Sequence, residues 1–358
     1  MSEYRKTTEG SRGTLTGNIK GLLQGFYSPS SVKDIKEILR NKKPDVVVIH
    51  NLYPYISPAI LKPIKEAGIP IIMTIHNYRL ICPTGLFMRD SKPCELCLEK
   101  KNELSCIQYN CEHSLIKSIG YAGRNWFARI TKAYNNVDVY ACITEFQAKK
   151  LVSYGFPNNK MRVIPNFVDK VEPLSSTNLY SNDYVAISGR MSKEKGTDMI
   201  LDIARKTPHI KYLFAGVVRE DDQDIIKDAP DNCIFAGYLS DDKLVDFYNN
   251  SRFIVIGSRC YEGFSMSVLD ASMYGKATIG PAHGGFIEII DDKETGLLFT
   301  PNNSESLQQQ IEYLWNNTDE AISMGVNAYN KLKKNYTSEA VKDKWERCIL
   351  DLLKSAKQ

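Results

Sequence analysis

The sequence has no run of about 18 apolar residues, so it predicts no membrane-spanning helix. Its first residues, Met-Ser-Glu-Tyr-Arg-Lys, are charged and lack the apolar centre of a signal peptide. The glycine fingerprint of dinucleotide-binding folds, the Walker loop, internal repeats and low-complexity tracts are missing as well. These absences argue against an integral membrane protein, an exported protein and a repeat protein. They predict a protein that stays in the cytoplasm.

A disulfide framework is also unexpected. The nine cysteines form an odd number, and no export signal accompanies them. Reduced compartments keep such cysteines as free thiols or as metal ligands.

Length and charge suggest two domains with different partners. A chain of 358 residues exceeds one ordinary core, and 43% hydrophobic with 25% charged residues is typical of a globular protein. Residues 1–170 contain 25 Lys+Arg and 14 Asp+Glu, a net charge of +11, whereas residues 171–358 contain 21 and 28, a net charge of −7. The first half therefore favours anionic surfaces such as lipid headgroups, pyrophosphates or nucleic acid. Solvated surface charge without a partner is the alternative.

Short apolar runs alternate with helical patterns along both halves, which predicts two tandem α/β domains with parallel sheets. The domain boundary is expected near 166–182, where turn and linker residues gather. Residues 303–358 are expected to be helical. The expected strands are 45–50, 69–76, 137–143, 161–165, 184–188, 210–215, 233–236, 253–257 and 277–280, and the clearest helices are 31–41, 197–206, 240–249, 266–274 and 338–354.

The first candidate site follows the strand at 184–188. Residues 188–196 read Ser-Gly-Arg-Met-Ser-Lys-Glu-Lys-Gly and lead into a helix. Glycines such as Gly189 let the backbone approach a ligand, and a helix N-terminus offers free N–H groups to an anion. Arg190 and Lys195 add two cations, so the segment can hold a diphosphate without a metal. A solvated basic loop is the plainer interpretation of this segment alone.

The second candidate site, at 261–275, follows the expected strand at 253–257. Glu262 and Gly263 precede a helix whose opening turn contains Phe264, Ser265 and Met266. Asp270 comes eight residues after Glu262, so the two carboxylates are on the order of 12 Å apart along a helix. That span fits one acid on a sugar and the other on a ribose, with phosphate on the amides between them. A third glycine turn, 284–288, aims at the same sheet end, where open α/β sheets bind ligands.

These three segments together resemble glycosyltransferase family 4. The resemblance is carried by Gly189-Arg190 with Glu194-Lys195-Gly196, by Glu262-Gly263-Phe264 followed by Asp270, and by Gly284-Gly285 with Glu288, and it covers roughly residues 40–350. It implies the GT-B fold, with two Rossmann-like domains facing a central cleft, transfer with retention at the anomeric carbon, and no metal in catalysis. Asp270 stands where the family more often has Glu. Ser265 stands where Gly is frequent, which would bias the choice of donor sugar.

The resemblance also assigns roles. It implies a nucleotide-diphosphate sugar as donor, UDP- or GDP-linked, and a glycan or polyprenyl-linked acceptor in surface polysaccharide synthesis. Arg190 and Lys195 would stabilise the departing nucleoside diphosphate, and Glu262 would bind the transferred sugar. His76, which ends the strand 69–76, would lie near the sugar and the acceptor; a satisfied strand-end histidine is the alternative. The donor-binding set is Gly189, Arg190, Lys195, Glu262, Gly263, Phe264, Ser265, Met266, Asp270, Gly285 and Glu288.

The same resemblance gives the expected domain limits. Residues 1–168 would form the acceptor-side domain, 169–337 the donor-binding domain, and 338–358 a helix that packs back toward the first domain. Family members usually begin with a further strand and a glycine-rich loop. About 60 residues of that pattern are expected to be missing here, which predicts either a truncated chain or a partner that supplies them.

Two features of the first half remain. Cys94, Cys97, Cys106 and Cys111, in the loop-like stretch 82–113, have spacings that suit a structural zinc, with free thiols as the alternative. Residues 114–136 mix basic and aromatic side chains, which suits a helix lying on an anionic membrane. Packing of that helix against its own domain is the alternative. The basic residues in question are Lys117, Arg124, Arg129 and Lys132, and the aromatic ones are Tyr121, Trp126 and Phe127.

Three other functions are less consistent with these patterns. A non-catalytic subunit or remnant would keep the donor site but not support transfer. A nucleotide-sugar epimerase of the same fold would lack the Glu262-to-Asp270 arrangement. A zinc-dependent nucleic-acid binder would leave the whole second half unexplained, so no nucleic-acid partner is expected.

Overall fold

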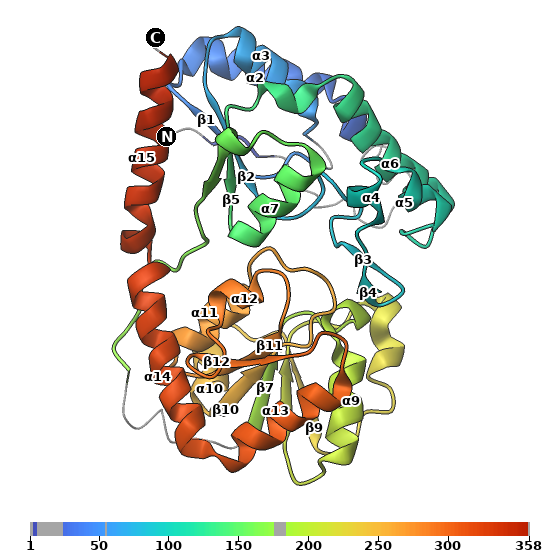
Figure 1. Cartoon of the computed structure of the whole chain (residues 1–358), viewed down its shortest axis with the longest axis vertical. Coiled ribbons are helices and arrows are strands. Elements are labelled where there is room, and N and C mark those ends of the chain that lie inside the picture. Colours follow the sequence, from blue (N-terminus) through green and yellow to red (C-terminus); the bar gives the residue numbers. More distant parts are fainter. Residues whose placement is uncertain (1–2, 6–23, 54–55, 175–183, 357–358) are drawn as a thin grey trace. The chain divides into compact units, whose positions relative to one another are not determined.

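The computed structural model describes residues 3–5, 24–53, 56–174 and 184–356. Contacts between residues divide the chain into two compact units. Unit 1 comprises Met1–Phe87, Glu95–Ile164 and Asp343–Gln358, and unit 2 comprises Met88–Cys94 and Pro165–Lys342. Each unit combines helices with a parallel sheet, as the alternation of patterns predicts (Figure 1).

Unit 1 is built on a four-stranded sheet in the order β1-β2-β5-β6, with all neighbours parallel. Every residue of β2 and β5 is buried, which explains why these strands read as continuous apolar runs. The strands are β1 (Val47–Ile49), β2 (Ile71–Ile75), β5 (Val139–Cys142) and β6 (Met161–Val163). The helices are α2 (Pro29–Lys42), α3 (Leu61–Glu66), α4 (Leu96–Glu99), α5 (Leu104–Gln108), α6 (Leu115–Ile130) and α7 (Glu145–Tyr154), with the end of α15 (Ser338–Ala356).

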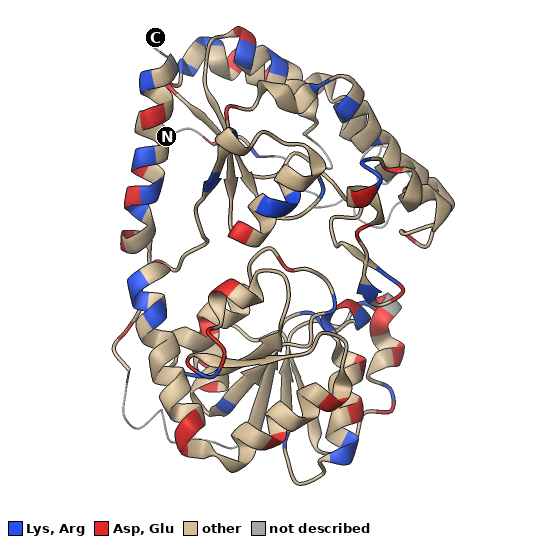
Figure 2. Cartoon of the chain, viewed as in Figure 1, with Lys and Arg blue, Asp and Glu red and all other residues tan. Residues whose placement is uncertain are grey.

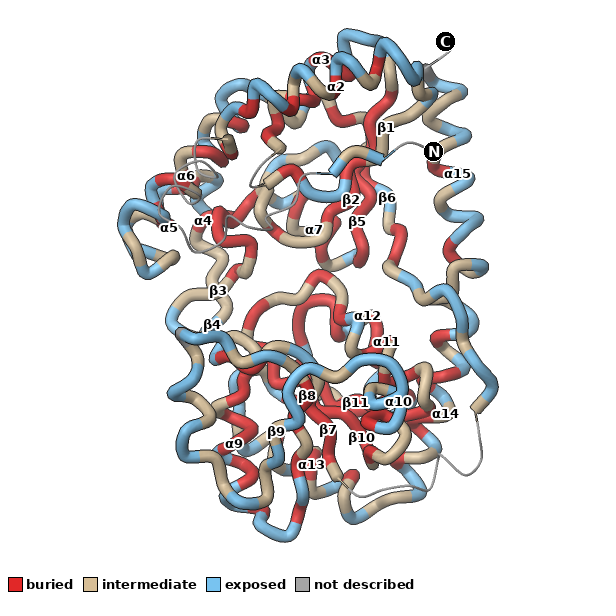
Figure 3. The backbone as a smooth tube through the Cα atoms, turned by 180° about the vertical axis from the view of Figure 1, so that it is seen from behind, coloured by how far each residue is buried: buried red, intermediate tan, exposed pale blue. Residues whose placement is uncertain are grey.

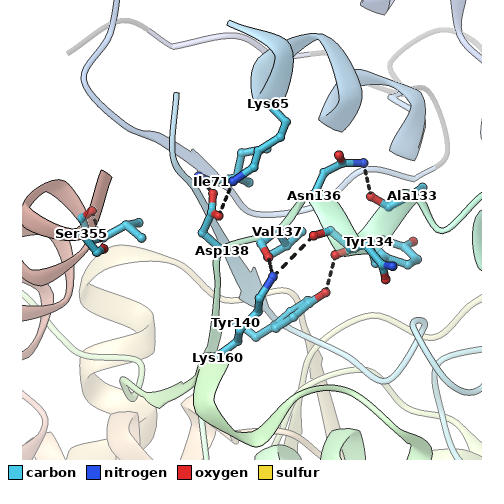
Figure 4. Close-up of polar contacts among 12 residues, drawn as sticks. Lys65, Ile71, Ala133, Tyr134, Asn136, Val137, Asp138, Tyr140, Lys160 and Ser355 are labelled. Atoms are coloured by element: carbon cyan, nitrogen blue, oxygen red, sulfur yellow. Dashed lines mark hydrogen bonds and ion pairs between the residues drawn. The ribbon is translucent and has the colours of Figure 1, made fainter. Parts of the chain in front are cut away.

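Polar contacts fix the amino end of this sheet (Figure 4). The carboxylate of Asp138 accepts a hydrogen bond from the Ile71 backbone N–H at 2.9 Å. It also forms an ion pair with Lys65 Nζ at 2.6 Å. Lys160 Nζ donates to the Val137 carbonyl at 2.5 Å. These contacts tie the starts of β2, β5 and β6 together, so the opposite, carboxyl edge of the sheet carries the residues that follow β1 and β2.

Unit 2 contains a six-stranded parallel sheet in the order β12-β11-β10-β7-β8-β9. Counted from β7, this is the order 3-2-1-4-5-6 of the Rossmann fold, and the direction of winding reverses between β7 and β10. The strands are β7 (Tyr184–Ser188), β8 (Tyr212–Ala215), β9 (Cys233–Gly237), β10 (Ser251–Val255), β11 (Thr278–Pro281) and β12 (Gly296–Phe299).

Helices and turns connect these strands, and buried side chains form two apolar clusters in the unit. Figure 3 shows the sheet strands of unit 2 as largely buried. The connecting elements are the 3₁₀ turns η4 (Lys193–Lys195) and η5 (Glu220–Ile225), and the helices α9 (Thr197–Lys206), α10 (Asp241–Asn249), α11 (Met266–Met273) and α12 (Phe286–Ile289). Helices α13 (Ser304–Asn316) and α14 (Thr318–Asn335) follow the last strand.

Three local predictions need correction. The strand expected at 253–257 is β10, Ser251–Val255, because Ser251 pairs with Tyr184 and the chain leaves the sheet before Gly257. The stretch 82–113 is not simply a loop: it contains α4, α5 and a hairpin of β3 (Met88–Arg89) and β4 (Lys92–Pro93). Asp90 and Ser91 have φ angles of 49° and 59°, which is the geometry of a tight two-residue hairpin turn. Strand β12 was not anticipated.

Among the described residues, no helix is both long enough and apolar enough to cross a membrane.

Candidate functional site

Glycines bring three loops of unit 2 together at the carboxyl end of the sheet, where its winding reverses. Gly196, with φ of +71°, lies against the loop after β10, and a Cβ on it would stand 2.1 Å from the Gly257 carbonyl oxygen. Gly285 lies equally close to the same loop, since its Cβ would stand 2.4 Å from the Gly263 carbonyl oxygen. Only residues without a side chain allow this approach.

Lys195 and Glu262 meet between the first two of these loops. Lys195 Nζ lies 2.7 Å from Glu262 Oε1, although the two residues are 67 positions apart. Burial would lower the pKa of Lys195, but the Glu262 carboxylate reverses this effect and raises the pKa above its ordinary value. Lys195 is therefore a fixed cation, and the sequence prediction that these two residues share a site is supported by the geometry.

Arg190 is the second cation of the site. It forms an ion pair with Glu194 in the same loop. Its Nε is buried and has no hydrogen-bond partner in the described part of the chain. Burial lowers the pKa of Arg190, and the nearby Arg219 adds to this by repulsion. A half-buried guanidinium with an unused Nε–H group is suited to a phosphate oxygen.

The third loop contributes backbone and a histidine that the sequence analysis missed. The Gly285 N–H donates to the Glu262 carbonyl at 2.8 Å. His283 is buried, and its Nε2 lies 3.1 Å from the Ser258 carbonyl. Because a carbonyl only accepts, Nε2 carries the proton, and the buried Nδ1 is an acceptor with no partner among the described residues. The signal for His283 is its place directly before Gly284-Gly285.

Asp270 lies apart from the ion pair, in the middle of α11. Burial raises the pKa of Asp270 to about 6. The Asp270 charge adds to the effect of burial in raising the pKa of Tyr248. The Tyr248 hydroxyl is 3.0 Å from Ser188 Oγ, and Ser188 Oγ is 3.0 Å from Ser267 Oγ. Asp270 is thus a half-buried acid beside hydroxyl groups that join the end of β7 to α11.

The remaining predicted donor residues take simple positions. Gly189 leaves β7 with φ of +119°, which favours glycine. Ser265 is buried and precedes the first residue of α11, Met266, whose side chain is exposed. Phe264 packs edge-to-face on Tyr336. Gly263 borders Gly285, and Glu288 lies in α12.

His76 belongs to a separate pocket in unit 1. His50 follows β1 and His76 follows β2, at the same edge of the sheet. His50 Nδ1 and His76 Nε2 are 2.9 Å apart, and the rings are stacked. They line an open pocket of about 410 Å³ together with Tyr53, Arg79 and Tyr134, among others. Aromatic, cationic and imidazole groups in one pocket can hold a polar ligand.

The four predicted zinc ligands are placed as follows. Cys94 belongs to unit 2, whereas Cys97, Cys106 and Cys111 belong to unit 1 and pack in one small cluster. The hydrogen bond with Cys111 and burial raise the pKa of the Cys106 thiol. Across the residues that the structure describes, no three His, Cys, Asp or Glu side chains are arranged to hold a metal ion. Structural zinc at these cysteines stays a prediction.

Comparison with known proteins shows the family of the chain. Residues 16–172 match the profile of Glycosyltransferase Family 4, and residues 176–331 match that of Glycosyl transferases group 1. The chain belongs to glycosyltransferase family 4. The resemblance predicted from the sequence is therefore confirmed.

Relatives and a solved structure show the same likeness. An uncharacterized 41.2 kDa protein in the cps region of Klebsiella pneumoniae is 24% identical over 53% of the chain and 60% of its own length. O-antigen chain mannosyltransferase C of Escherichia coli is 24% identical over 49% of the chain and 48% of its own length. The chain thus spans about half the length of these curated relatives.

The solved structure is that of the Anabaena protein HepE with UDP and glucose. It superposes with a TM-score of 0.65 at 15% identity, over 89% of this chain and 81% of HepE. At that identity the likeness shows the fold alone. That fold is GT-B, with two Rossmann-like domains, as predicted.

Proposed function

We propose that this chain is a retaining glycosyltransferase that moves a sugar from a nucleoside-diphosphate sugar to a glycan or lipid-linked acceptor. The observation that carries this proposal is the meeting of three glycine-containing loops at the switch point of unit 2. There the loops gather two cations, Arg190 and Lys195, and one carboxylate, Glu262. Ligands of open α/β sheets bind at such a switch point.

The two cations suit the leaving group. Negative charge develops on the nucleoside diphosphate as the bond to the sugar breaks, and fixed cations in a half-buried site stabilise that charge strongly. Arg190 has an unused Nε–H, and Lys195 is held in place by Glu262. With two cations of its own, the site needs no metal ion to neutralise the diphosphate.

The acids suit hydroxyl groups. Glu262 accepts one hydrogen bond from Lys195 through Oε1, so its second oxygen can accept from a sugar hydroxyl. Asp270, eight residues further along, can accept from the ribose hydroxyls. His283 adds an acceptor, Nδ1, beside the same loops.

The acceptor half of the reaction is assigned to unit 1. His76 and His50 line its pocket with Arg79 and two tyrosines, and hydroxyl-rich or phosphorylated acceptors match these groups. The E. coli relative is named for O-antigen chains and the Klebsiella relative for a cps region, which supports an acceptor in surface polysaccharide synthesis. A lipid-linked acceptor places the enzyme on the cytoplasmic side, at the membrane surface.

The test is binding followed by transfer. HepE was solved with UDP, so UDP is the first of a calorimetry panel that continues with GDP, ADP, CDP and dTDP. One nucleoside diphosphate should bind more tightly than the others, and Lys195→Met should weaken the binding of that nucleotide. Lys193→Met is the matched control, because Lys193 is an exposed lysine of the same turn.

Transfer is then measured with the sugar of the preferred nucleotide and a polyprenyl-phosphate or glycan acceptor. Anomeric configuration of the product is read by NMR. Binding of the nucleotide sugar without transfer to any acceptor would select the non-catalytic alternative. Failure of every nucleoside diphosphate to bind would overturn the proposal itself.

A further inference from the structure

Helix α6 carries its apolar side outward. The buried residues of α6 are small or polar: Ser118, Gly120, Ala122, Arg124, Asn125 and Ala128. Its exposed large apolar residues are Leu115, Ile116, Ile119, Trp126 and Ile130, with Ile116 76% and Trp126 50% exposed. A helix on the surface of a globular protein normally shows the reverse arrangement.

The outward side is a continuous stripe. At about 100° per residue, the five exposed apolar positions fall within an arc of about 100°. The one other residue of α6 in that arc is Gly123, so no polar side chain interrupts the stripe. We call these five residues the α6 stripe. Helix α5, which packs against α6, exposes two more large side chains, Leu104 and Tyr109.

Polar contacts hold α6 in this orientation. Arg124 is stacked between the rings of Tyr53 and Tyr121, and its guanidinium donates to the Pro83 carbonyl at 3.0 Å. Asn125 donates to the Arg79 carbonyl at 2.6 Å. Turning the stripe inward would break these contacts and leave a buried arginine unpaired, which is costly. The outward stripe is therefore a fixed feature of unit 1.

The charges that α6 itself carries are positive. Helix α6 contains three basic residues and no Asp or Glu. Lys117 and Lys132 are exposed. In Figure 2, which colours basic residues blue and acidic residues red, α6 carries no red. Two of the basic residues expected to contact lipid are engaged elsewhere: Arg124 is buried, and Arg129 forms a bidentate pair with Glu103. The sequence expectation is therefore wrong for Arg124. Arg129 is exposed, so its role at a membrane stays a prediction.

We propose that the α6 stripe lies in the headgroup region of an anionic bilayer, with α6 parallel to the membrane plane. An interfacial helix buries an apolar face in this region and keeps its lysines at the phosphates, and tryptophan favours the same depth. A second copy of the chain fits less well, because it would bring together two α6 helices that both carry a positive charge and no acid. This inference deepens the proposed function and rests on it, because the lipid-linked acceptor is part of that function. The test of membrane binding does not need activity.

The test is co-sedimentation of the full chain with vesicles of phosphatidylcholine alone and of phosphatidylcholine with phosphatidylglycerol. The wild type should bind the anionic vesicles, and 1 M salt should weaken this binding because it screens the lysines. Ile116→Ser with Ile119→Ser should reduce the vesicle affinity at least about tenfold, since two isoleucines lose their apolar burial. The matched control is Ile234→Ser, an equally exposed isoleucine of unit 2.

Further readouts separate the outcomes. The tryptophan emission should shift to the blue on anionic vesicles, and Trp126→Phe should remove this shift. Glu262→Gln should bind vesicles like the wild type, so a failed donor site and a failed membrane site are distinguishable. Unchanged circular dichroism of the double variant excludes loss of folding. Absence of binding to anionic vesicles overturns the proposal. The proposal is also overturned if the wild type forms a dimer in sedimentation, and if the double variant abolishes this dimer while Ile234→Ser does not.

Discussion

His50 Nδ1 lies 2.9 Å from His76 Nε2, across the ends of two neighbouring parallel strands. At that distance one imidazole donates an N–H hydrogen bond to an unprotonated nitrogen of the other. The two rings therefore cannot both be charged. Burial lowers the pKa of both histidines, and repulsion from His50 lowers that of His76 further; Glu3 opposes the effect on His50. The folded protein therefore holds this pair neutral at pH 7.

The pair makes stability depend on pH. An unfolded histidine takes up a proton near pH 6.5, whereas the folded pair does so only at lower pH. Between these values the unfolded state binds more protons, so the free energy of unfolding should rise with pH through the window below about 6.5. Thermal unfolding from pH 5 to 7.5 measures this. His76→Gln should flatten the slope, and His209→Gln, at an exposed position in unit 2, should not.

Glu262→Gln should separate transfer from binding. The amide keeps the size of the side chain but loses the charge that would tighten on sugar hydroxyls in the transition state. We expect kcat to fall about 10²–10³-fold, or about 3 kcal/mol, with nearly unchanged affinity for the nucleoside diphosphate. Glu294→Gln, an exposed acid of unit 2, is the matched control. Near-normal transfer by Glu262→Gln would show that Glu262 is not the acid that binds the transferred sugar.

Asp270 should give nucleotide binding a pH dependence of its own. Burial raises its pKa to about 6, so half of the molecules carry a neutral Asp270 at that pH. Ribose hydroxyls donate to the ionised form, so binding should release a proton and the affinity should rise between pH 5 and 7. Calorimetry of the preferred nucleoside diphosphate across this range measures the slope. Asp270→Asn should abolish it; an equal slope in the variant would place the titrating group elsewhere.

The same group affects stability in the opposite direction. Because the folded pKa of Asp270 is raised, the folded state binds more protons than the unfolded state between about pH 4 and 6. The contribution of Asp270 to stability is therefore lost as the pH rises through this window. Thermal unfolding of Asp270→Asn and of the wild type at pH 5 and pH 7 isolates this contribution of Asp270 to stability.

The cysteines offer a further test. If Cys94, Cys97, Cys106 and Cys111 hold zinc, protein purified under reducing conditions should contain about one zinc per chain, and chelation should lower the unfolding temperature without stopping transfer. Cys348→Ser, at a buried cysteine of unit 1 outside the cluster, should keep the metal. Elemental analysis without zinc rejects the site and leaves free thiols.

The sequence was enough for the local elements of unit 2. Strand β7 and helix α9 have the predicted bounds, because their apolar residues follow one period without interruption. The predicted bounds of strand β10 lay too late in the sequence, because the polar start of this strand, Ser251-Arg252, does not resemble a buried strand. Strand β12 is only four residues long, which is too short for a clear pattern.

What the sequence could not give is contact between distant residues. Lys195 and Glu262 were each assigned to the site from their own loop and from the family resemblance, but their direct ion pair depends on the order of the strands. The partnerless Nδ1 of His283 depends on the Ser258 carbonyl, 25 residues away. The side of α6 that faces solvent was equally hidden, because the helical pattern fixes where the apolar arc lies and not what covers it.

The close approach of Gly196 to Gly257 provides a sharp test of how the loops hold the site. Gly196→Ala puts a Cβ 2.1 Å from the Gly257 carbonyl oxygen, at a φ of +71°. Gly237 is the matched control: its φ is +69°, but a Cβ there meets nothing within 4 Å. Gly237→Ala should therefore cost only the strain of a left-handed residue, about 1–2 kcal/mol.

Gly196→Ala should cost clearly more, because the loops after β7 and β10 must move apart to relieve the clash. That movement would also displace Lys195 from Glu262, so nucleoside-diphosphate binding should weaken in Gly196→Ala and stay normal in Gly237→Ala. Denaturant unfolding and calorimetry on both variants measure the two effects. Equal losses of stability, with binding intact in both, would show that the approach of these two loops does not hold the donor site together.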